Sequence, residues 1–146
     1  MTCEGKIRED LKEALKQRNQ TRVSVLRMLL SEIKNTEIAQ QKHLDDDKIL
    51  DVISTEVKRH RESIEAFRQG NRGDLVVQEK AELSILMGYL PKQMSREEIR
   101  AAARRIIETV GVKGKGSVMA QLMPQLRGKA DGKEVSEIVS ELLSAA

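Results

Sequence analysis

The sequence predicts an all-α protein, and its composition gives the first reason. Only Phe67 and Tyr89 are aromatic among 146 residues, whereas β-sheets depend on aromatic and β-branched side chains. Leu, Ile, Ala, Glu, Lys, Gln and Arg dominate instead, and these residues form helices or tolerate them well. The second reason is that two prolines and nine glycines leave room for long uninterrupted segments. The third is that apolar residues recur at steps of three and four, which is the spacing of one helical face.

We expect an N-terminal domain, residues 1–90, that contains four helices with a long helical hairpin. The apolar stripes place these helices at about 4–18, 21–40, 45–69 and 74–90. Asp45, Asp46 and Asp47 supply the cap and the first-turn acids of the third and longest helix. Asp74 is expected to cap the fourth. Because only the glycine-containing segment 69–73 separates these two long helices, they should fold back on each other.

Residues 95–146 are predicted to form a small C-terminal domain of three helices. The segment Leu90-Pro91-Lys92-Gln93-Met94 is the clearest boundary in the chain, because Pro91 ends the preceding helix. The three helices should begin after Ser95, at Ser117 and after Asp131. Ser95 and Glu98 have the spacing of a capping box. Pro124 falls inside the second apolar pattern, so we expect a kink or an early stop there.

The net charge of +3 comes from the C-terminal part of the chain. Residues 1–90 hold 16 basic and 16 acidic side chains, which balance. Within 113–133, Asp131 is the only acid beside five basic residues: Lys113, Lys115, Arg127, Lys129 and Lys133. Two glycine turns place these cations near two helix N-termini, where backbone N–H groups also point outward. We predict a face that contacts the phosphates of RNA. The alternative is a solvated loop whose lysines serve solubility.

The sequence shows no arrangement of residues that is typical of an active site. Cys3 is the only cysteine and lies near a terminus, with no positioned base. His60 lies on an apolar helical stripe, which indicates a packing role, and His43 lies in a polar linker. Glu79 also lies in an apolar stripe, where an ion pair across the hairpin is the simplest interpretation. We therefore predict no catalytic residue, no metal and no cofactor.

The chain carries no sign of a membrane or secretory destination. No run approaches the ~18 apolar residues that a membrane-spanning helix needs. The N-terminus lacks the apolar stretch of a secretory signal, and a single cysteine excludes an internal disulfide. We expect a cytoplasmic protein that has no membrane partner.

Three stretches carry a resemblance to a known family: Arg22 to Glu37 (RVSVLRMLLSEIKNTE), Tyr89 to Ser95 (YLPKQMS) and Gly128 to Lys133 (GKADGK). In their order and spacing they resemble the YqeY family, also called GatB/YqeY-domain proteins, over nearly the whole chain. The resemblance implies helical N-terminal and C-terminal parts, and a bacterial protein. It also implies that the C-terminal part is similar to the tail of the B subunit of the tRNA-dependent amidotransferase, which helps to hold the tRNA.

Three functions remain open at this point. The first is a non-catalytic accessory protein that binds tRNA or other structured RNA through Lys113, Lys115, Arg127, Lys129 and Lys133. The second is an adaptor that binds a protein partner through its helices. The third is a component of a carbon–nitrogen ligase with glutamine as amido donor, active only in a complex. The amidotransferase's catalytic parts have no counterpart here, so we do not expect an enzyme in the isolated chain.

Overall fold

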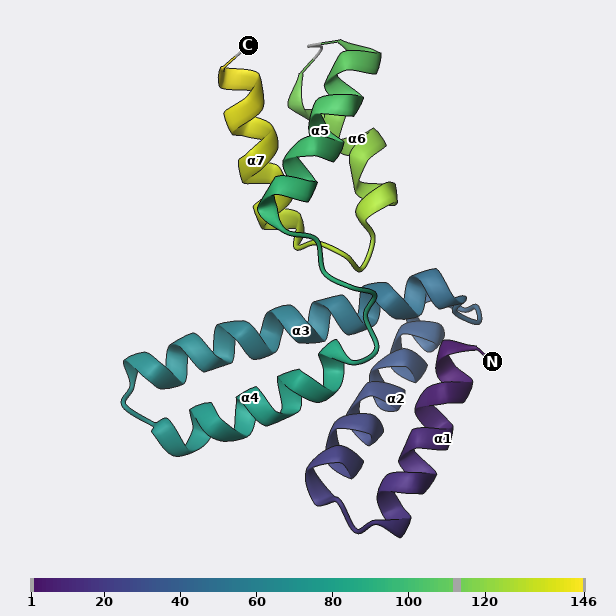
Figure 1. The fold of residues 1–146 in the computed structure, drawn as a ribbon. Coiled ribbons are helices and arrows are strands. Elements are labelled where there is room, and N and C mark those ends of the chain that lie inside the picture. Colours follow the sequence, from purple (N-terminus) through teal and green to yellow (C-terminus); the bar gives the residue numbers. More distant parts are fainter. Residues whose placement is uncertain (1, 112–113, 146) are drawn as a thin grey trace. The chain divides into compact units, whose positions relative to one another are not determined.

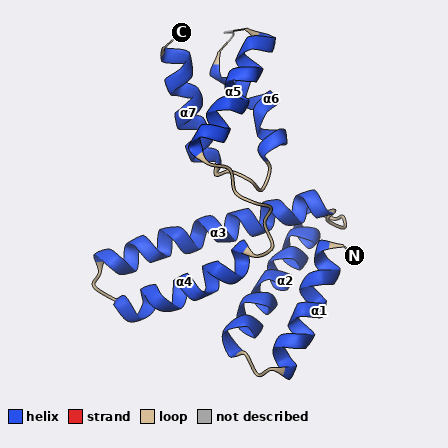
Figure 2. Cartoon of the chain, in the orientation of Figure 1, coloured by secondary structure: helices blue, strands red, loops and turns tan. Residues whose placement is uncertain are grey.

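The computed structural model describes residues 2–111 and 114–145, and every regular element among them is a helix (Figures 1 and 2). The helices are α1 (Cys3–Lys16), α2 (Gln20–Gln40), α3 (Asp46–Gln69), α4 (Gly73–Met87), α5 (Arg96–Val110), α6 (Lys115–Leu126) and α7 (Gly132–Ser144). The predicted all-α fold is confirmed. Within these described ranges, none of the helices combines the length and the apolar character that crossing a membrane requires.

The chain divides into two compact units, Met1–Leu90 and Pro91–Ala146. In the first, α1 and α2 form one helical hairpin, and α3 and α4 form a longer one (Figure 1). Their apolar stripes meet in one core, which is a single cluster of buried side chains: Ile7, Val25, Leu26, Leu29, Ile33, Leu44, Ile49, Ile53, Val57 and Leu86. Burial of these stripes, rather than helix propensity alone, is what stabilises helices of this length.

The second unit packs α5, α6 and α7 around a core of its own. Its buried side chains are Ile99, Ala102, Ala103, Val118, Leu122, Leu126, Val135, Ile138 and Val139. Each of the three helices contributes three of them, at the three- and four-residue steps of one helical face. The unit therefore does not need the first core to bury its apolar stripes.

Helix caps explain where most of the helices begin. Asp45 accepts a hydrogen bond from the Lys48 amide at 2.9 Å and so caps α3. Ser95 and Glu98 form the predicted capping box of α5. The prediction for Asp74 was wrong, because Arg72 is the N-cap residue of α4 and makes no side-chain cap bond. Asp74 lies in the first turn instead, where its charge complements the helix dipole and pairs with the Arg72 guanidinium at 3.2 Å.

Two helix boundaries of the second unit differ from the sequence prediction. α6 begins at Lys115 rather than Ser117, because Gly114 adopts a positive φ of 120° and starts the helix two residues earlier. Pro124 does not stop α6, which continues to Leu126. The proline lies in the last turn of α6 and removes only one backbone donor. Burial of Leu122 and Leu126 on either side of it stabilises the helical course.

Candidate functional site

The basic residues singled out in the sequence lie at two ends of α6. Lys115 is the first residue of this helix, whereas Arg127, Lys129 and Lys133 follow its last turn or begin α7. The 12 residues of α6 span about 18 Å at 1.5 Å per residue. The structure therefore brings three of these residues to one end of α6 and places Lys115 at the other. Lys113 lies outside the described residues.

The segment 127–133, which we call the basic turn, is held by the residues that open the second unit. The side-chain amide of Gln93 donates to the Gly128 carbonyl at 2.7 Å, and the Met94 amide donates to the Lys129 carbonyl at 2.8 Å. Gly128 has a φ of 74°, a conformation that favours glycine. Two of the stretches that carry the family resemblance thus contact each other directly. The consequence is a turn whose backbone is fixed by long-range hydrogen bonds.

Sequence reasoning missed Lys92 as a member of this surface. Lys92 is exposed, and the bonds of the next two residues bring it to the basic turn. The charge of Lys92 acts on Glu98. Hydrogen bonds with Ser95 are the main cause that lowers the pKa of the Glu98 carboxyl, and the positive charge of Lys92 lowers it further. The sequence did contain a signal for Lys92, because this residue lies within the family-like stretch Tyr89 to Ser95. That stretch was interpreted only as the boundary between the two domains.

The acids near the basic turn have partners of their own. The Asp131 carboxylate accepts a bond from the Lys133 amide at 3.4 Å and caps α7. Glu134 pairs with Arg96 at 3.4 Å. The start of α7 is thus occupied by a carboxylate, whereas the start of α6 has no side-chain cap. The first backbone N–H groups of α6 therefore lack a side-chain acceptor, as expected, whereas at α7 the Asp131 carboxylate accepts from one of them.

A second polar cluster lies in the first unit and connects the first residues of two family-like stretches, Arg22 and Tyr89, through Asp10. The Tyr89 hydroxyl donates to Asp10 at 2.5 Å, and Arg22 lies 3.6 Å from the same carboxylate. The Lys6 ammonium stands 5.7 Å from the centre of the Tyr89 ring. These four side chains line an open cavity of about 350 Å³. Their contacts tie the residues that follow α4 to α1 and α2, which is a structural role.

Cys3 is not activated as a nucleophile. Its side chain is partly buried, and burial is the main cause that raises the pKa of the thiol. The neighbouring Asp46 raises it further, and Lys6 opposes the shift. Because the thiolate is the reactive form, a raised pKa means less nucleophile at neutral pH.

We expect Cys3 in the folded protein to react with iodoacetamide several-fold more slowly than a free cysteine at pH 8, because less of it is thiolate and burial limits access. The measurement is the alkylation rate by mass spectrometry, with and without denaturant. The rate should rise to that of a free cysteine once the chain unfolds. Equal rates in the folded and unfolded protein would contradict the assignment.

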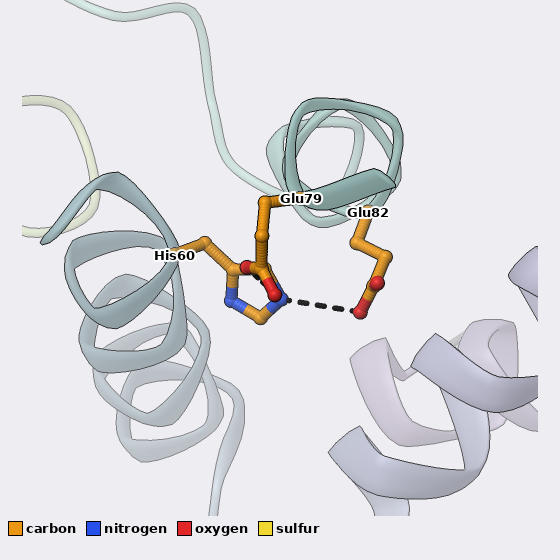
Figure 3. Close-up of side chains that lie close together, drawn as sticks. All are labelled: His60, Glu79 and Glu82. Atoms are coloured by element: carbon orange, nitrogen blue, oxygen red, sulfur yellow. Dashed lines mark hydrogen bonds and ion pairs between the residues drawn. The ribbon is translucent and has the colours of Figure 1, made fainter. Parts of the chain in front are cut away.

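A third cluster lies between the helices of the α3–α4 hairpin (Figure 3). His60 is buried on α3, and its Nε2 lies 3.7 Å from Glu79 Oε2 and 3.4 Å from Glu82 Oε1, both on α4. Glu79 therefore does face a basic group across the hairpin, as expected. Sequence reasoning missed that Glu82 joins it. The three-residue spacing of the two glutamates, which puts both on one helical face, was the available signal.

The fold and the basic turn define a small all-helical protein of two units, with a fixed cationic surface on the second. The sequence profile of the Yqey-like protein family matches residues 4–143. The chain therefore belongs to this family, and the resemblance drawn from the three stretches is confirmed.

The chain is also similar to fungal proteins named "Altered inheritance of mitochondria protein 41, mitochondrial". It is 29% identical to that of Pyrenophora tritici-repentis over 96% of this chain and 80% of the relative. It is 34% identical to that of Kluyveromyces lactis over 87% of this chain and 68% of the relative. With the Lachancea thermotolerans protein the identity is 41%, over 58% of this chain and 46% of the relative. The match thus spans about half of that relative's length.

These relatives correct one expectation about the protein and leave another without support. The prediction of a bacterial protein was wrong, because the curated relatives are fungal and carry a mitochondrial designation. The expected cytoplasmic location also finds no support among them. Their names state neither an RNA ligand nor a ligase activity.

Proposed function

We propose that this chain is a non-catalytic, RNA-associated accessory protein whose Pro91–Ala146 unit contacts the phosphate backbone of tRNA or similar structured RNA. The main contacts are the cations of the basic turn, Arg127, Lys129 and Lys133, together with Lys92. Lys115 forms a second contact at the far end of α6, and Lys113 is a candidate from the sequence alone. The resemblance to the amidotransferase tail that the family-like stretches imply for this part of the chain is the reason for choosing tRNA as the class of RNA.

The observation that carries the proposal is the fixed backbone of the basic turn. Gln93 and Met94 hold its two carbonyls at 2.7 and 2.8 Å, so less chain entropy is lost when the turn binds a partner. Lys129 and Lys133 are exposed, and neither forms an ion pair with any residue that the structure describes. Both ammonium groups are thus available to a phosphate.

The composition of the second unit limits how it reads RNA. No aromatic residue follows Tyr89 in the sequence, so bases cannot stack on aromatic rings there, which is the usual route to sequence-specific RNA recognition. Contacts from lysine and arginine to phosphates depend instead on charge and backbone shape. The proposed binding is therefore tolerant of sequence and falls steeply with salt.

The test is the binding of bulk yeast tRNA to the purified full chain over a salt series, measured by fluorescence anisotropy. We expect the double variant Lys129→Glu, Lys133→Glu to bind at least about tenfold more weakly at low salt, with a salt slope less steep by roughly 1 for each lysine lost. Lys115→Glu, measured alone, reports whether the far end of α6 contributes a further contact.

The matched control is Lys16→Glu, Lys58→Glu, which makes the same change of charge on exposed helix positions of the first unit. It should leave binding nearly unchanged, apart from the long-range effect of net charge at low salt. The proposal fails if the wild-type chain does not bind tRNA even at low salt, or if the control loses as much affinity as the basic-turn variant. A protein adaptor would then be the function to pursue.

The cellular location is a separate proposal. The relatives are mitochondrial by name, and a mitochondrial location therefore has more support than the cytoplasmic one expected from the sequence. Immunoblotting of fractionated cells of the source organism tests it, and recovery only in the cytosolic fraction would refute it.

A further inference from the structure

The cluster of His60, Glu79 and Glu82 presents three ligand atoms to one point. One atom from each side chain lies within 4.8 Å of the others, and Figure 3 shows the imidazole directed from α3 toward both glutamates of α4. The histidine is buried, and about a fifth of each glutamate side chain is exposed, at 22% and 23%. The point is thus enclosed on the histidine side and open to solvent on the glutamate side.

The hydrogen bonds of the ring decide what kind of group the cluster needs. His60 Nδ1 lies 2.8 Å from the Glu56 carbonyl oxygen. A carbonyl can only accept, so Nδ1 carries the proton and donates it. In a neutral ring Nε2 then bears a lone pair, which points at two carboxylates that are acceptors as well. Three electron-rich atoms facing one another need a positive charge, which either a proton on Nε2 or a cation bound between the three atoms supplies.

The surroundings of the cluster have two features that are typical of a metal site. A metal-binding histidine donates its other N–H to a carbonyl or carboxylate, which fixes its tautomer, and His60 does so with Glu56. Ligating carboxylates are themselves hydrogen-bonded. Here the Gln78 side-chain amide donates to Glu82 Oε2 at 3.1 Å and leaves Oε1 directed at the histidine.

The distances agree with a tetrahedral ion. Ligand atoms placed 2.0–2.1 Å from a tetrahedral zinc lie about 3.3–3.4 Å from one another. The Nε2–oxygen distances are 3.4 Å to Glu82 and 3.7 Å to Glu79, so a small movement of two glutamate side chains closes the site. The imidazole nitrogen favours a first-row transition ion over Mg²⁺ or Ca²⁺, which prefer ligands that are all oxygen.

The position of the cluster gives such an ion a structural task. The contiguous cluster of the first core ends at Val57 on α3 and includes Leu86 as its one fully buried residue of α4, whereas Ile64, further along α3, is buried outside that cluster. His60 follows Val57 along α3, and Glu82 and Glu79 precede Leu86 along α4, so the cluster lies on the side of these core residues that is nearer the α3–α4 turn. Figure 1 shows that the hairpin extends there beyond α1 and α2. Val77, on the part of α4 that lies beyond the core, is 70% exposed. Apolar burial stabilises this part less, and a bridging ion would hold its two helices together.

We propose that His60, Glu79 and Glu82 bind a divalent first-row transition metal such as Zn²⁺, with water completing the coordination, and that the ion clamps α3 to α4. The ion neutralises two carboxylates that otherwise repel each other and ties side chains of two helices to one centre. Because it binds the folded hairpin and not the unfolded chain, it stabilises the protein by RT ln(1 + c/Kd), where c is the free Zn²⁺ concentration. This stabilisation rises with the logarithm of c once c exceeds Kd.

The experiment titrates Zn²⁺ into the chelator-treated full chain by isothermal titration calorimetry, in the background of His43→Gln. That substitution is needed because His43 is 78% exposed and lies 2.7 Å from Glu37, so it offers an adventitious site. We expect one Zn²⁺ per chain with Kd at or below the micromolar range, and a higher Tm with zinc than without. The double variant Glu79→Gln, Glu82→Gln should weaken binding at least about 100-fold, and Gln78→Ala roughly 10–100-fold.

Glu62→Gln is the matched control, because it removes an exposed carboxylate of the same helix as His60. It should leave Kd unchanged. Circular dichroism of each metal-free variant establishes that the helices persist, so that loss of binding is not loss of fold. The proposal is overturned if the His43→Gln chain binds no Zn²⁺, or if the Glu79→Gln, Glu82→Gln variant binds as well as its parent. His60 would then be a charged imidazolium paired with the glutamates.

Discussion

Replacing Ile138 by alanine is expected to leave the Pro91–Ala146 unit largely unfolded while the first unit stays folded. Ile138 is fully buried, at 0% exposure, in the core formed by α5, α6 and α7. Truncation of a buried isoleucine costs about 2–5 kcal/mol, from lost transfer energy and from the cavity left behind. A core of this small size rarely supplies more than about 3–5 kcal/mol. The cost of the substitution therefore approaches the whole stability of the unit.

The measurement is a two-dimensional amide NMR spectrum of the variant, in which the signals of residues beyond Pro91 should collapse to unfolded positions and those of the first unit should not. Val77→Ala is the control, because it removes methyl groups at a site that is 70% exposed and should change stability by less than about 0.5 kcal/mol. The tRNA binding that we propose should be lost with the collapse, although every basic residue is retained. A single cooperative transition that melts both units together would show that they do not fold separately.

The helices could be predicted from the sequence because they depend on local patterns. The spacing of apolar residues located all seven, and side-chain caps at Asp45, Ser95 and Asp131 fixed the starts of three of them. The errors fall where backbone geometry or packing outweighs local preference. Gly114 starts α6 before the serine that pattern reasoning chose, and the buried neighbours of Pro124 carry the helix past it.

The basic surface could be predicted only in part, because residues close in sequence need not lie together. Lys115 and Lys129 flank the same apolar pattern, yet the length of α6 separates them. Conversely, Lys92 lies beside the basic turn because Gln93 and Met94 bond to it, over a separation of 35 residues. Such contacts between distant parts of the sequence depend on how α5, α6 and α7 pack. A local sequence pattern therefore cannot predict them.

The cluster in the α3–α4 hairpin shows the same limit. His60 and Glu79 each stood out in the sequence as polar residues on apolar stripes, but what a stripe faces depends on the register of the hairpin. That register places α4 so that Glu79 and Glu82 both reach Nε2 of the histidine. His60, which the sequence pattern assigned to core packing, is therefore the centre of a polar cluster.

Tyr89→Phe is expected to lower the free energy of unfolding by about 1–2 kcal/mol at pH 7, because a hydrogen bond to a charged group contributes more than one between neutral groups. The Tyr89 hydroxyl donates to the Asp10 carboxylate at 2.5 Å. Burial raises the pKa of this hydroxyl above its ordinary value of 10.0, and the bond to Asp10 raises it further. The folded protein thus holds the phenol proton more tightly than the unfolded chain does.

The raised pKa fixes the sign of a pH dependence. Since the folded-state pKa lies above the unfolded one, the stability that this proton contributes is complete below about pH 10, the pKa of tyrosine in an unfolded chain. It is lost progressively as the pH rises above that value toward the folded-state pKa. Urea unfolding of both proteins between pH 7 and pH 11 measures the effect. The difference in unfolding free energy should stay constant up to about pH 10 and shrink above it. A difference that is absent at pH 7, or that grows in alkali, would mean that the hydroxyl does not hold α4 to α1 through Asp10.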